Sequence, residues 1–202
     1  MPKLVDHDER RAELVAAAGR LIARNGLEAA TVRAIAAEAG CSTGVLDHYF
    51  ADKDDLLLQA LAASHQRISD RFARVARGRR GLAAVRALLA DNLPTDASRR
   101  DETRLEVQFW ARSLGDRALL EVQRREMGAF RRALGRHLEE AVADGETAAG
   151  VDADDALDRL LALMDGLSVR AVLEPARLPA TRQRTLLDQE VDRLRASGVP
   201  AR

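Results

Sequence analysis

The residues best suited to chemistry lie between positions 31 and 57, in the segment TVRAIAAEAGCSTGVLDHYFADKDDLL. Two short helical patterns flank Gly40, a residue type that tolerates the positive φ of a sharp turn, and this arrangement is typical of a helix-turn-helix. After the turn, we expect Thr43, Asp47 and His48 to face outward from the second short helix. Hydroxyl and imidazole groups can hydrogen bond to base edges, and a helix N-terminus can approach phosphate. The segment therefore predicts contact with DNA.

No pattern elsewhere in the sequence predicts catalysis or a metal site. The histidines stand at positions 7, 48, 65 and 137 and form no pair at metal-ligand spacing. Asp152, Asp154 and Asp155 lack the pattern of a calcium loop, and helix capping explains them better. The sequence has no phosphate-binding glycine loop, nucleophile elbow or HExxH helix. We therefore expect no enzyme activity, no catalytic or metal-binding residue and no cofactor.

The composition favours an all-α cytoplasmic protein. Among 202 residues, 38 are alanine, and the five prolines leave 3–93 and 95–174 free of the residue that breaks helices. Basic and acidic residues number 32 each, so any binding to DNA must depend on local features. No apolar run approaches the roughly 20 residues that cross a bilayer, and the N-terminus lacks an apolar signal core. We expect no membrane partner.

Apolar residues at helical spacing predict about nine helices. We expect Thr31, Ser42, Asp52 and Ser98 to cap four of them, with Asp55 as the capping-box partner of Asp52. The expected ranges are about 9–25, 32–39, 43–49, 53–77, 82–92, 99–114, 116–143, 155–173 and 180–196.

The helix expected at 53–77 divides the chain into two functional parts. We expect a three-helix DNA-binding domain at 1–52 and a helical effector-binding and dimerisation domain at 53–202. At ~1.5 Å per residue the helix is about 37 Å long, enough to connect two bodies. Its arginines at 67, 71 and 74 are expected to form a solvated face. The last two helices carry more apolar surface than a monomer needs, so we expect them to pair in a homodimer.

The N-terminal segment resembles the DNA-binding domain of the TetR family of transcriptional repressors. The matching residues run from Arg10 to about Leu61 and include Thr31, Ile35, Ala36, Ala39, Gly40, Ser42, Gly44, Phe50, Lys53 and Leu56. The chain is also similar to the choline-responsive BetI-like branch, through residues 1–4, 42–44, 48–50, 52–53, 109–111, 165–167 and 170–171. It departs from the family at Asp47, where many members carry tyrosine, and from the branch at Ser168, where tryptophan is found.

The resemblance implies a homodimeric, ligand-responsive repressor that binds a palindromic double-stranded DNA operator. It implies groove-facing roles for Ser42, Thr43, Gly44, Val45 and His48, and phosphate contacts for Thr31, Arg33, Tyr49 and Lys53. Asp47 either accepts a hydrogen bond from a cytosine amine or lies off the interface. Residues 1–50 hold six basic and seven acidic residues, so we expect a weak dependence of DNA binding on salt.

A small-molecule effector is expected in the C-terminal part. The candidate ligand-binding residues are Glu106, Phe109, Trp110, Phe130 and Asp165. Aromatic faces beside a carboxylate can hold a cation, although packing in the core would explain the rings equally well. A cationic effector and a neutral hydrophobic effector both remain open. A helical-bundle enzyme and a pure interaction scaffold are the alternatives from other classes.

Overall fold

The computed structural model describes residues 7–195, and this part of the chain forms nine α-helices, as predicted. The first four are α1 (His7–Asn25), α2 (Val32–Glu38), α3 (Thr43–Tyr49) and α4 (Lys53–Ala76). The other five are α5 (Gly81–Asn92), α6 (Ala97–Ser113), α7 (Arg117–Ala143), α8 (Ala153–Leu173) and α9 (Ala180–Arg193). The similarity noted at residues 1–4 lies outside the described residues.

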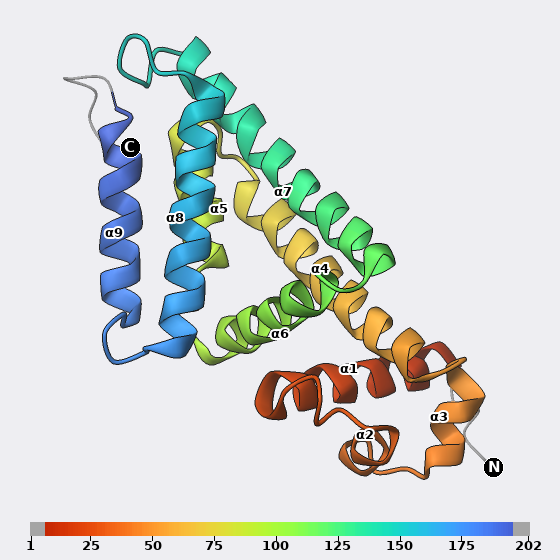
Figure 1. Ribbon diagram of the computed structural model, residues 1–202. Coiled ribbons are helices and arrows are strands. Elements are labelled where there is room, and N and C mark those ends of the chain that lie inside the picture. The colour runs from red at the N-terminus through yellow and green to blue at the C-terminus, as the bar shows by residue number, and fades with distance from the viewer. Residues whose placement is uncertain (1–6, 196–202) are drawn as a thin grey trace.

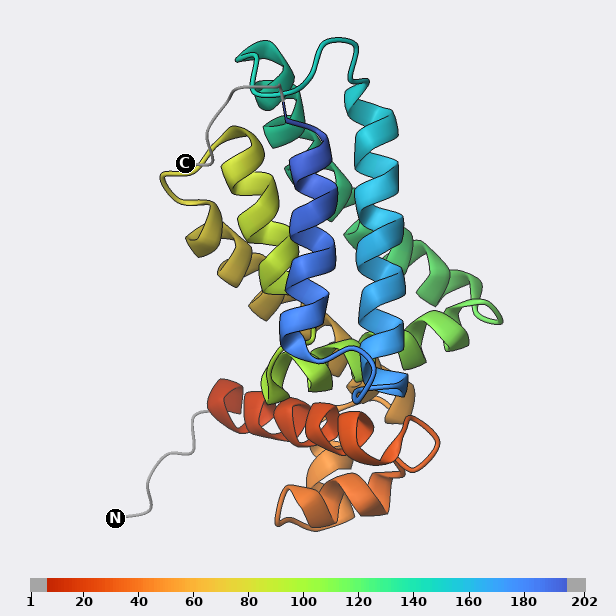
Figure 2. The same cartoon turned by 90° about the vertical axis from the view of Figure 1, so that its left-hand side faces the viewer.

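Helices α1 to α3 form a small unit at one end of the molecule, and α5 to α9 form a larger bundle at the other (Figure 1). Helix α4 runs from the first into the second. The larger bundle ends in α8 and α9, which lie side by side in both views (Figures 1 and 2). Among residues 7–195, no helix combines the length and the apolar character needed to span a membrane.

The turn between α2 and α3 forms for the local reasons that the sequence suggests. The Thr31 side chain caps α2 by accepting a hydrogen bond from the backbone nitrogen of Ala34, at 3.2 Å. Gly40 adopts a φ of 64°, in the left-handed region that glycine favours. Ser42 occupies the N-cap position of α3, but its hydroxyl accepts no capping hydrogen bond. The Ser42 side chain is exposed instead, beside the rest of the outward face of α3.

Two hydrogen bonds between side chains and backbone fix the start of α4. Asp52 accepts from the backbone nitrogen of Asp55 at 2.8 Å, and the Asp55 carboxylate accepts from the backbone nitrogen of Ala51 at 3.1 Å. These bonds confirm the predicted capping role of the two residues. They also set the direction in which α4 leaves the N-terminal unit.

Two hydrophobic cores meet along α4. The first turns of α4 contribute Leu56, Leu57 and Leu61 to the N-terminal core, together with residues of α1 to α3. The last turns contribute Phe72 and Val75 to a C-terminal core formed with α5, α7, α8 and α9. The N-terminal core therefore extends beyond residue 52, into the first turns of α4.

Three helices of the C-terminal part, α6, α7 and α8, are capped by aspartate side chains. Asp96 caps α6 by accepting from the backbone nitrogen of Arg99, Asp116 caps α7, and Asp152 caps α8 by accepting from Asp155. The prediction of Ser98 as a cap is wrong, because α6 begins two residues earlier, where a carboxylate supplies the acceptor. The capping explanation for the acidic loop before α8 is confirmed at Asp152.

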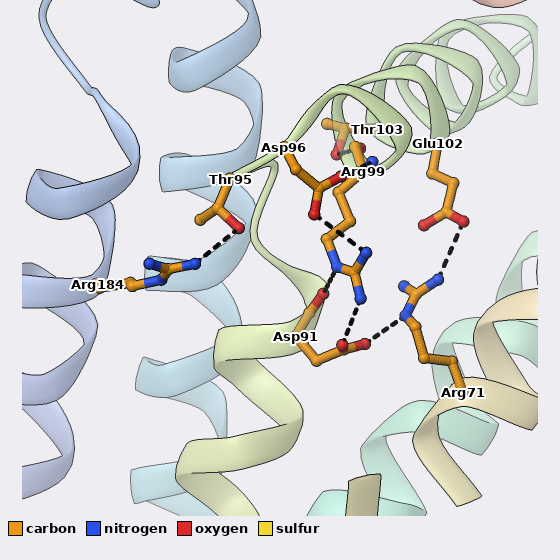
Figure 3. A network of polar contacts seen from close by, with 8 residues as sticks. All are labelled: Arg71, Asp91, Thr95, Asp96, Arg99, Glu102, Thr103 and Arg184. Atoms are coloured by element: carbon orange, nitrogen blue, oxygen red, sulfur yellow. Dashed lines mark hydrogen bonds and ion pairs between the residues drawn. The ribbon is translucent and has the colours of Figure 1, made fainter. Parts of the chain in front are cut away.

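A cluster of charged side chains joins α4, α5 and α6 (Figure 3). The Arg71 guanidinium pairs with Asp91 at the end of α5 and with Glu102 on α6, and Arg99 pairs with the other oxygen of Asp91. Arg71 is only 13% exposed in its side chain. The expectation of a solvated arginine face is therefore wrong for Arg71, because its two acidic partners come from distant parts of the sequence.

We predict that Arg71→Ala lowers the stability of the fold. Glu102 would lose the ion-pair partner that the structure gives it, and an unpaired carboxylate that is mostly buried is costly. Because the cluster keeps some solvent contact and Asp91 keeps Arg99, we expect a loss of about 2 kcal/mol, or a Tm roughly 4–8 °C lower.

Thermal unfolding followed by circular dichroism measures this change. Arg67→Ala is the matched control, since Arg67 lies one turn away on the exposed side of α4. Surface substitutions of this kind change stability by about 0.5 kcal/mol or less. Equal Tm values for the two variants would show that the cluster contributes nothing to stability.

Candidate functional site

The outer surface of α3 gathers the residues predicted to read bases. Ser42, Thr43, Gly44 and His48 are exposed, and Val45 is half-buried. The opposite side of α3 is anchored, because Leu46 and the following Phe50 are buried in the N-terminal core. A short helix held in this way presents its exposed side chains rigidly. Asp47 is exposed as well, on the same short helix.

The start of α1 lies against α3, which the sequence did not predict. The rings of His7 and Tyr49 are 5.6 Å apart between centroids, and the His7 and His48 rings are 5.9 Å apart. A shallow hollow is lined by both helices, with Arg10 from α1 and Gly44 from α3 at its wall. His7 and Arg10 therefore border the same surface as the predicted reading residues. Only the tertiary contact reveals this, because the sequence gives no signal that joins α1 to α3.

Of the residues predicted to contact phosphate, Tyr49 borders this surface, and the other three lie on neighbouring elements. Thr31 and Arg33 are exposed at the start of α2, and Lys53 is half-buried in the first turn of α4. The Thr31 oxygen already accepts from Ala34, so its hydroxyl proton remains the group that can donate. Tyr49 is half-buried against His7 and His48. The nine residues predicted to contact DNA thus lie on α2 and α3, at the positions that cap them, and at the first position of α4.

A cavity of about 590 Å³ lies in the C-terminal part, lined by residues of α4, α5, α6, α7 and α8. Four of the five predicted ligand-binding residues line it, namely Glu106, Trp110, Phe130 and Asp165. A volume of this size is typical of sites that enclose a drug-sized small molecule. Trp110 and Phe130 both border this cavity, and Phe130 also packs against the C-terminal core.

Phe109 does not line the cavity. Its ring is 1% exposed and belongs to the N-terminal core with Leu105 and Leu119. Consecutive residues on a helix point about 100° apart, so Phe109 and its neighbour Trp110 face different bodies. The prediction of Phe109 as a ligand-binding residue does not agree with this placement.

Several residues that line the cavity were not predicted from the sequence. Phe72 on α4 stacks on Phe130, with ring centroids 5.0 Å apart and an angle of 24° between the planes. His65, Phe72 and Ala76 follow one another at helical spacing on α4, and this spacing is the signal that could have identified them. Gln123 on α7 and Ser168 on α8 are buried, and each has a polar side-chain atom with no hydrogen-bond partner among the described residues.

The acidic groups of the cavity differ in their partners. Glu102 forms an ion pair with Arg71 of α4, and an oxygen of Glu106 lies 2.7 Å from His65 Nε2, also on α4, a contact that is an ion pair when the imidazole is protonated. Burial lowers the pKa of His65, but the contact with Glu106 raises it by more, and the net shift is upward. Asp165 has no ion pair or hydrogen bond among the described residues, and burial raises its pKa to about 6.

The fold and these two sites together define a class of protein. A helix-turn-helix unit presents an exposed recognition helix, and a long helix connects it to a separate bundle that encloses a ligand-sized cavity. This is the architecture of a helix-turn-helix DNA-binding regulator, and comparison with known proteins identifies the family.

The chain belongs to the TetR family of bacterial regulatory proteins. Residues 14–60 match the family described as bacterial regulatory proteins, tetR family, and residues 81–196 match that of BetI-type transcriptional repressors, C-terminal. The families and relatives matched are transcriptional regulators, so the prediction that the chain is not an enzyme is confirmed.

Two curated relatives cover almost the whole chain. The HTH-type transcriptional regulator PksA of Bacillus subtilis is 32% identical over 197 residues, which is 95% of this chain and 93% of PksA. The regulator BetI of Burkholderia mallei is 31% identical and covers 98% of this chain and 100% of its own. A transcriptional regulator from Saccharomonospora viridis, crystallised in complex with choline, superimposes with a TM-score of 0.86 at 25% identity and covers 92% of this chain and 96% of its own.

We predict that Asp165→Asn raises the stability of the protein at neutral pH. The unfolded chain releases this proton near pH 4 and the folded chain near pH 6, so the carboxyl group opposes folding increasingly as the pH rises between those values. Asparagine removes this penalty. Because the carboxylate keeps some solvent contact, we expect a gain of about 1 kcal/mol at pH 7.5, or roughly 3 °C in Tm.

Differential scanning calorimetry at several pH values measures the effect. The difference in Tm between the variant and the original chain shrinks as the pH falls toward 4, because the original carboxyl group then becomes neutral in the folded state. A variant that is less stable at pH 7.5 would indicate a stabilising partner for Asp165.

Proposed function

We propose that this regulator is a homodimeric repressor, that it binds a palindromic operator through α3, and that a small-molecule effector in the cavity releases it from DNA. The observation that carries the proposal is the continuity of α4, which starts in the core of the DNA-binding unit and lines the cavity with His65 and Phe72. A DNA-binding regulator acts where the chromosome lies, and we therefore assign it to the cytoplasm.

In the proposed complex, the exposed side of α3 enters the major groove. Thr43 and His48 read base edges together with Ser42, Gly44 and Val45, while Thr31, Arg33, Tyr49 and Lys53 hold phosphates. Two such helices read successive major grooves when they stand about 34–36 Å apart. The helix N-terminus beginning at Thr43 adds a favourable dipole toward phosphate.

The second copy is proposed to pack on α8 and α9. The large apolar side chains of these helices are mostly used inside the chain, and Leu173 is the one that stays strongly exposed on them, at 74%. The outer side of α8 nevertheless carries Ala162 and Gly166, which are exposed and one turn apart. Small residues at this spacing allow two helices to approach closely. A four-helix contact of this kind is consistent with the surface of α8 and α9.

The effector is proposed to act by moving α4 relative to the bundle. A ligand that contacts Glu106, Trp110, Phe130 and Asp165 also meets His65 and Phe72, so it favours one position of α4 over another. The position of α4 sets the separation of the two recognition helices. Coupling of this kind is reciprocal, because an effector that weakens operator binding tenfold must itself bind the operator complex tenfold more weakly, a coupling of about 1.4 kcal/mol.

We predict that the double variant Thr43→Ala, His48→Ala loses sequence-selective binding and keeps the fold. Both side chains are exposed and contribute nothing to the core. Each lost contact with a base edge costs about 1–3 kcal/mol. The measurement is fluorescence anisotropy with a duplex selected from a random pool by the original chain, compared with a scrambled duplex. An unchanged ratio of the two affinities would remove these residues from base reading.

Lys53→Ala is predicted to weaken binding to the selected and the scrambled duplex equally. Lys53 stands in the first turn of α4, away from the exposed side of α3, and suits a phosphate contact. We expect the slope of log affinity against log salt to become shallower by about one unit. A loss confined to the selected duplex would contradict the phosphate role. Sedimentation of each variant provides the control, since the same dimer should persist in all of them.

A further inference from the structure

The cavity is larger than a compact cation needs. Its volume is about 590 Å³, and apolar side chains such as Ile68, Leu161 and Met164 make up much of the wall. Sites of this size bury most of a drug-sized molecule. A compact ion such as choline would leave apolar wall uncovered, which contributes no binding free energy. The ligand therefore needs an apolar body as well as any charged group.

Two side chains of the cavity wall have oxygen atoms that no hydrogen-bond donor of the described residues contacts. Asp165 lines the cavity as a partly buried carboxylate with no described partner. Ser168 stands three residues further along α8, on the same side of the helix, is 6% exposed, and its hydroxyl oxygen is also without a partner. The nitrogen of a quaternary ammonium ion has no N–H group, so it attracts the Asp165 carboxylate by charge alone and donates no hydrogen bond to either oxygen. A protonated amine can donate to both, through charge-assisted hydrogen bonds.

The remaining charges of the wall leave Asp165 as the group available for a cation. Glu102 and Glu106 are paired with Arg71 and His65, as described above. Three basic residues of the cavity wall each have an acidic partner of their own, namely Arg99, Arg131 and His137. Arg136 and Glu126 are exposed, so solvent screens their charges.

Gln123 adds a second requirement. It is 2% exposed, lines the cavity from α7, and its side-chain nitrogen has no hydrogen-bond partner among the described residues. An unpaired buried donor is costly and is satisfied by an oxygen acceptor on a ligand. Phe72 and Phe130 stack beside it in the wall, and Trp110 adds a third ring, so an aromatic or alkyl body finds apolar contact.

From these contacts we infer that the effector is an amphipathic amine: a protonated primary or secondary amine bound by Asp165 and Ser168, with an ether, hydroxyl or carbonyl oxygen for Gln123 and an apolar body. This inference rests on the proposed function, because it names the ligand class for the same cavity. It separates this chain from a receptor for a compact quaternary ammonium ion. Asp165 is then a specificity-determining residue, since its carboxylate favours N–H donors.

The test compares ligands that differ only in the charged group. Isothermal titration calorimetry with the full chain at pH 7.5 uses phenoxybutylamine, its N,N,N-trimethyl derivative, neutral phenoxybutanol and choline. We expect the amine to bind about tenfold or more tightly than each of the other three, because it alone pairs a charge with N–H donors. Equal or tighter binding of the trimethyl derivative or of the alcohol overturns the inference, and so does a failure of the amine to bind.

Two variants locate the contact. Asp165→Asn is expected to weaken binding of phenoxybutylamine about tenfold or more and to leave phenoxybutanol unchanged, whereas Asp155→Asn should change neither. Asp155 is the matched control because it is an exposed aspartate on the same helix, paired with Arg159 and outside the cavity. An unchanged amine affinity in Asp165→Asn overturns the assignment. The ligand comparison with the original chain remains decisive if the variant does not fold.

Release of DNA is measured separately, so that this inference and the proposed function can fail independently. Amine binding that depends on Asp165 but leaves operator affinity unchanged would support the ligand class and contradict control of DNA binding by the cavity. Release of the operator by phenoxybutanol without any response to the amine would contradict the ligand class and support the proposed control. Release by the amine, abolished in Asp165→Asn, supports both.

Discussion

Helix α4 belongs to two hydrophobic cores at once, and the rest of the structure depends on this. Leu56, Leu57 and Leu61 fix its first turns in the DNA-binding unit, while Phe72 and Val75 fix its last turns in the bundle. A continuous helix of 24 residues is about 36 Å long and bends little without a break. A displacement of α4 in the bundle would therefore also displace the DNA-binding unit that is packed on its first turns.

Helix α6 adds a second connection of a different kind. Its Gln108 side chain hydrogen bonds to the backbone of Ile22 and Leu27, at the end of α1, and Phe109 packs in the N-terminal core. On another side of α6, Glu106 and Trp110 reach the cavity. The cavity wall and the DNA-binding unit are thus attached to the same helix. Together with α4, α6 connects the cavity wall to the DNA-binding unit.

Local signals in the sequence were enough to predict the helices, and contacts between distant segments were not. Thr31, Gly40 and Asp52 act within a few residues of themselves, so their roles as cap, turn and cap could be predicted. The prediction of Ser98 as a cap failed because Asp96 and Ser98 are both residue types that cap helices, and they lie within three positions of each other. Cap preference alone ranks serine and aspartate almost equally.

Most residues of the candidate sites could be predicted from the sequence, but the direction in which their side chains face could not. Trp110 and Phe109 are neighbours in sequence and face different bodies, which only the packing of α6 decides. Arg71 has the spacing of a solvated face, yet its partners stand 20 and 31 residues away in the sequence. His7 reaches the recognition helix for a similar reason. In each case the missing information is tertiary contact, which helical periodicity does not contain.

The position of Trp110 gives the protein an intrinsic fluorescent probe of its cavity. Trp110 is the single tryptophan of the chain, and it lines the cavity of the C-terminal part. Indole emission from this protein therefore comes from one place, next to any molecule that enters. Occupancy of the cavity can be followed optically, in the intact protein and in the presence of DNA, without attaching a dye.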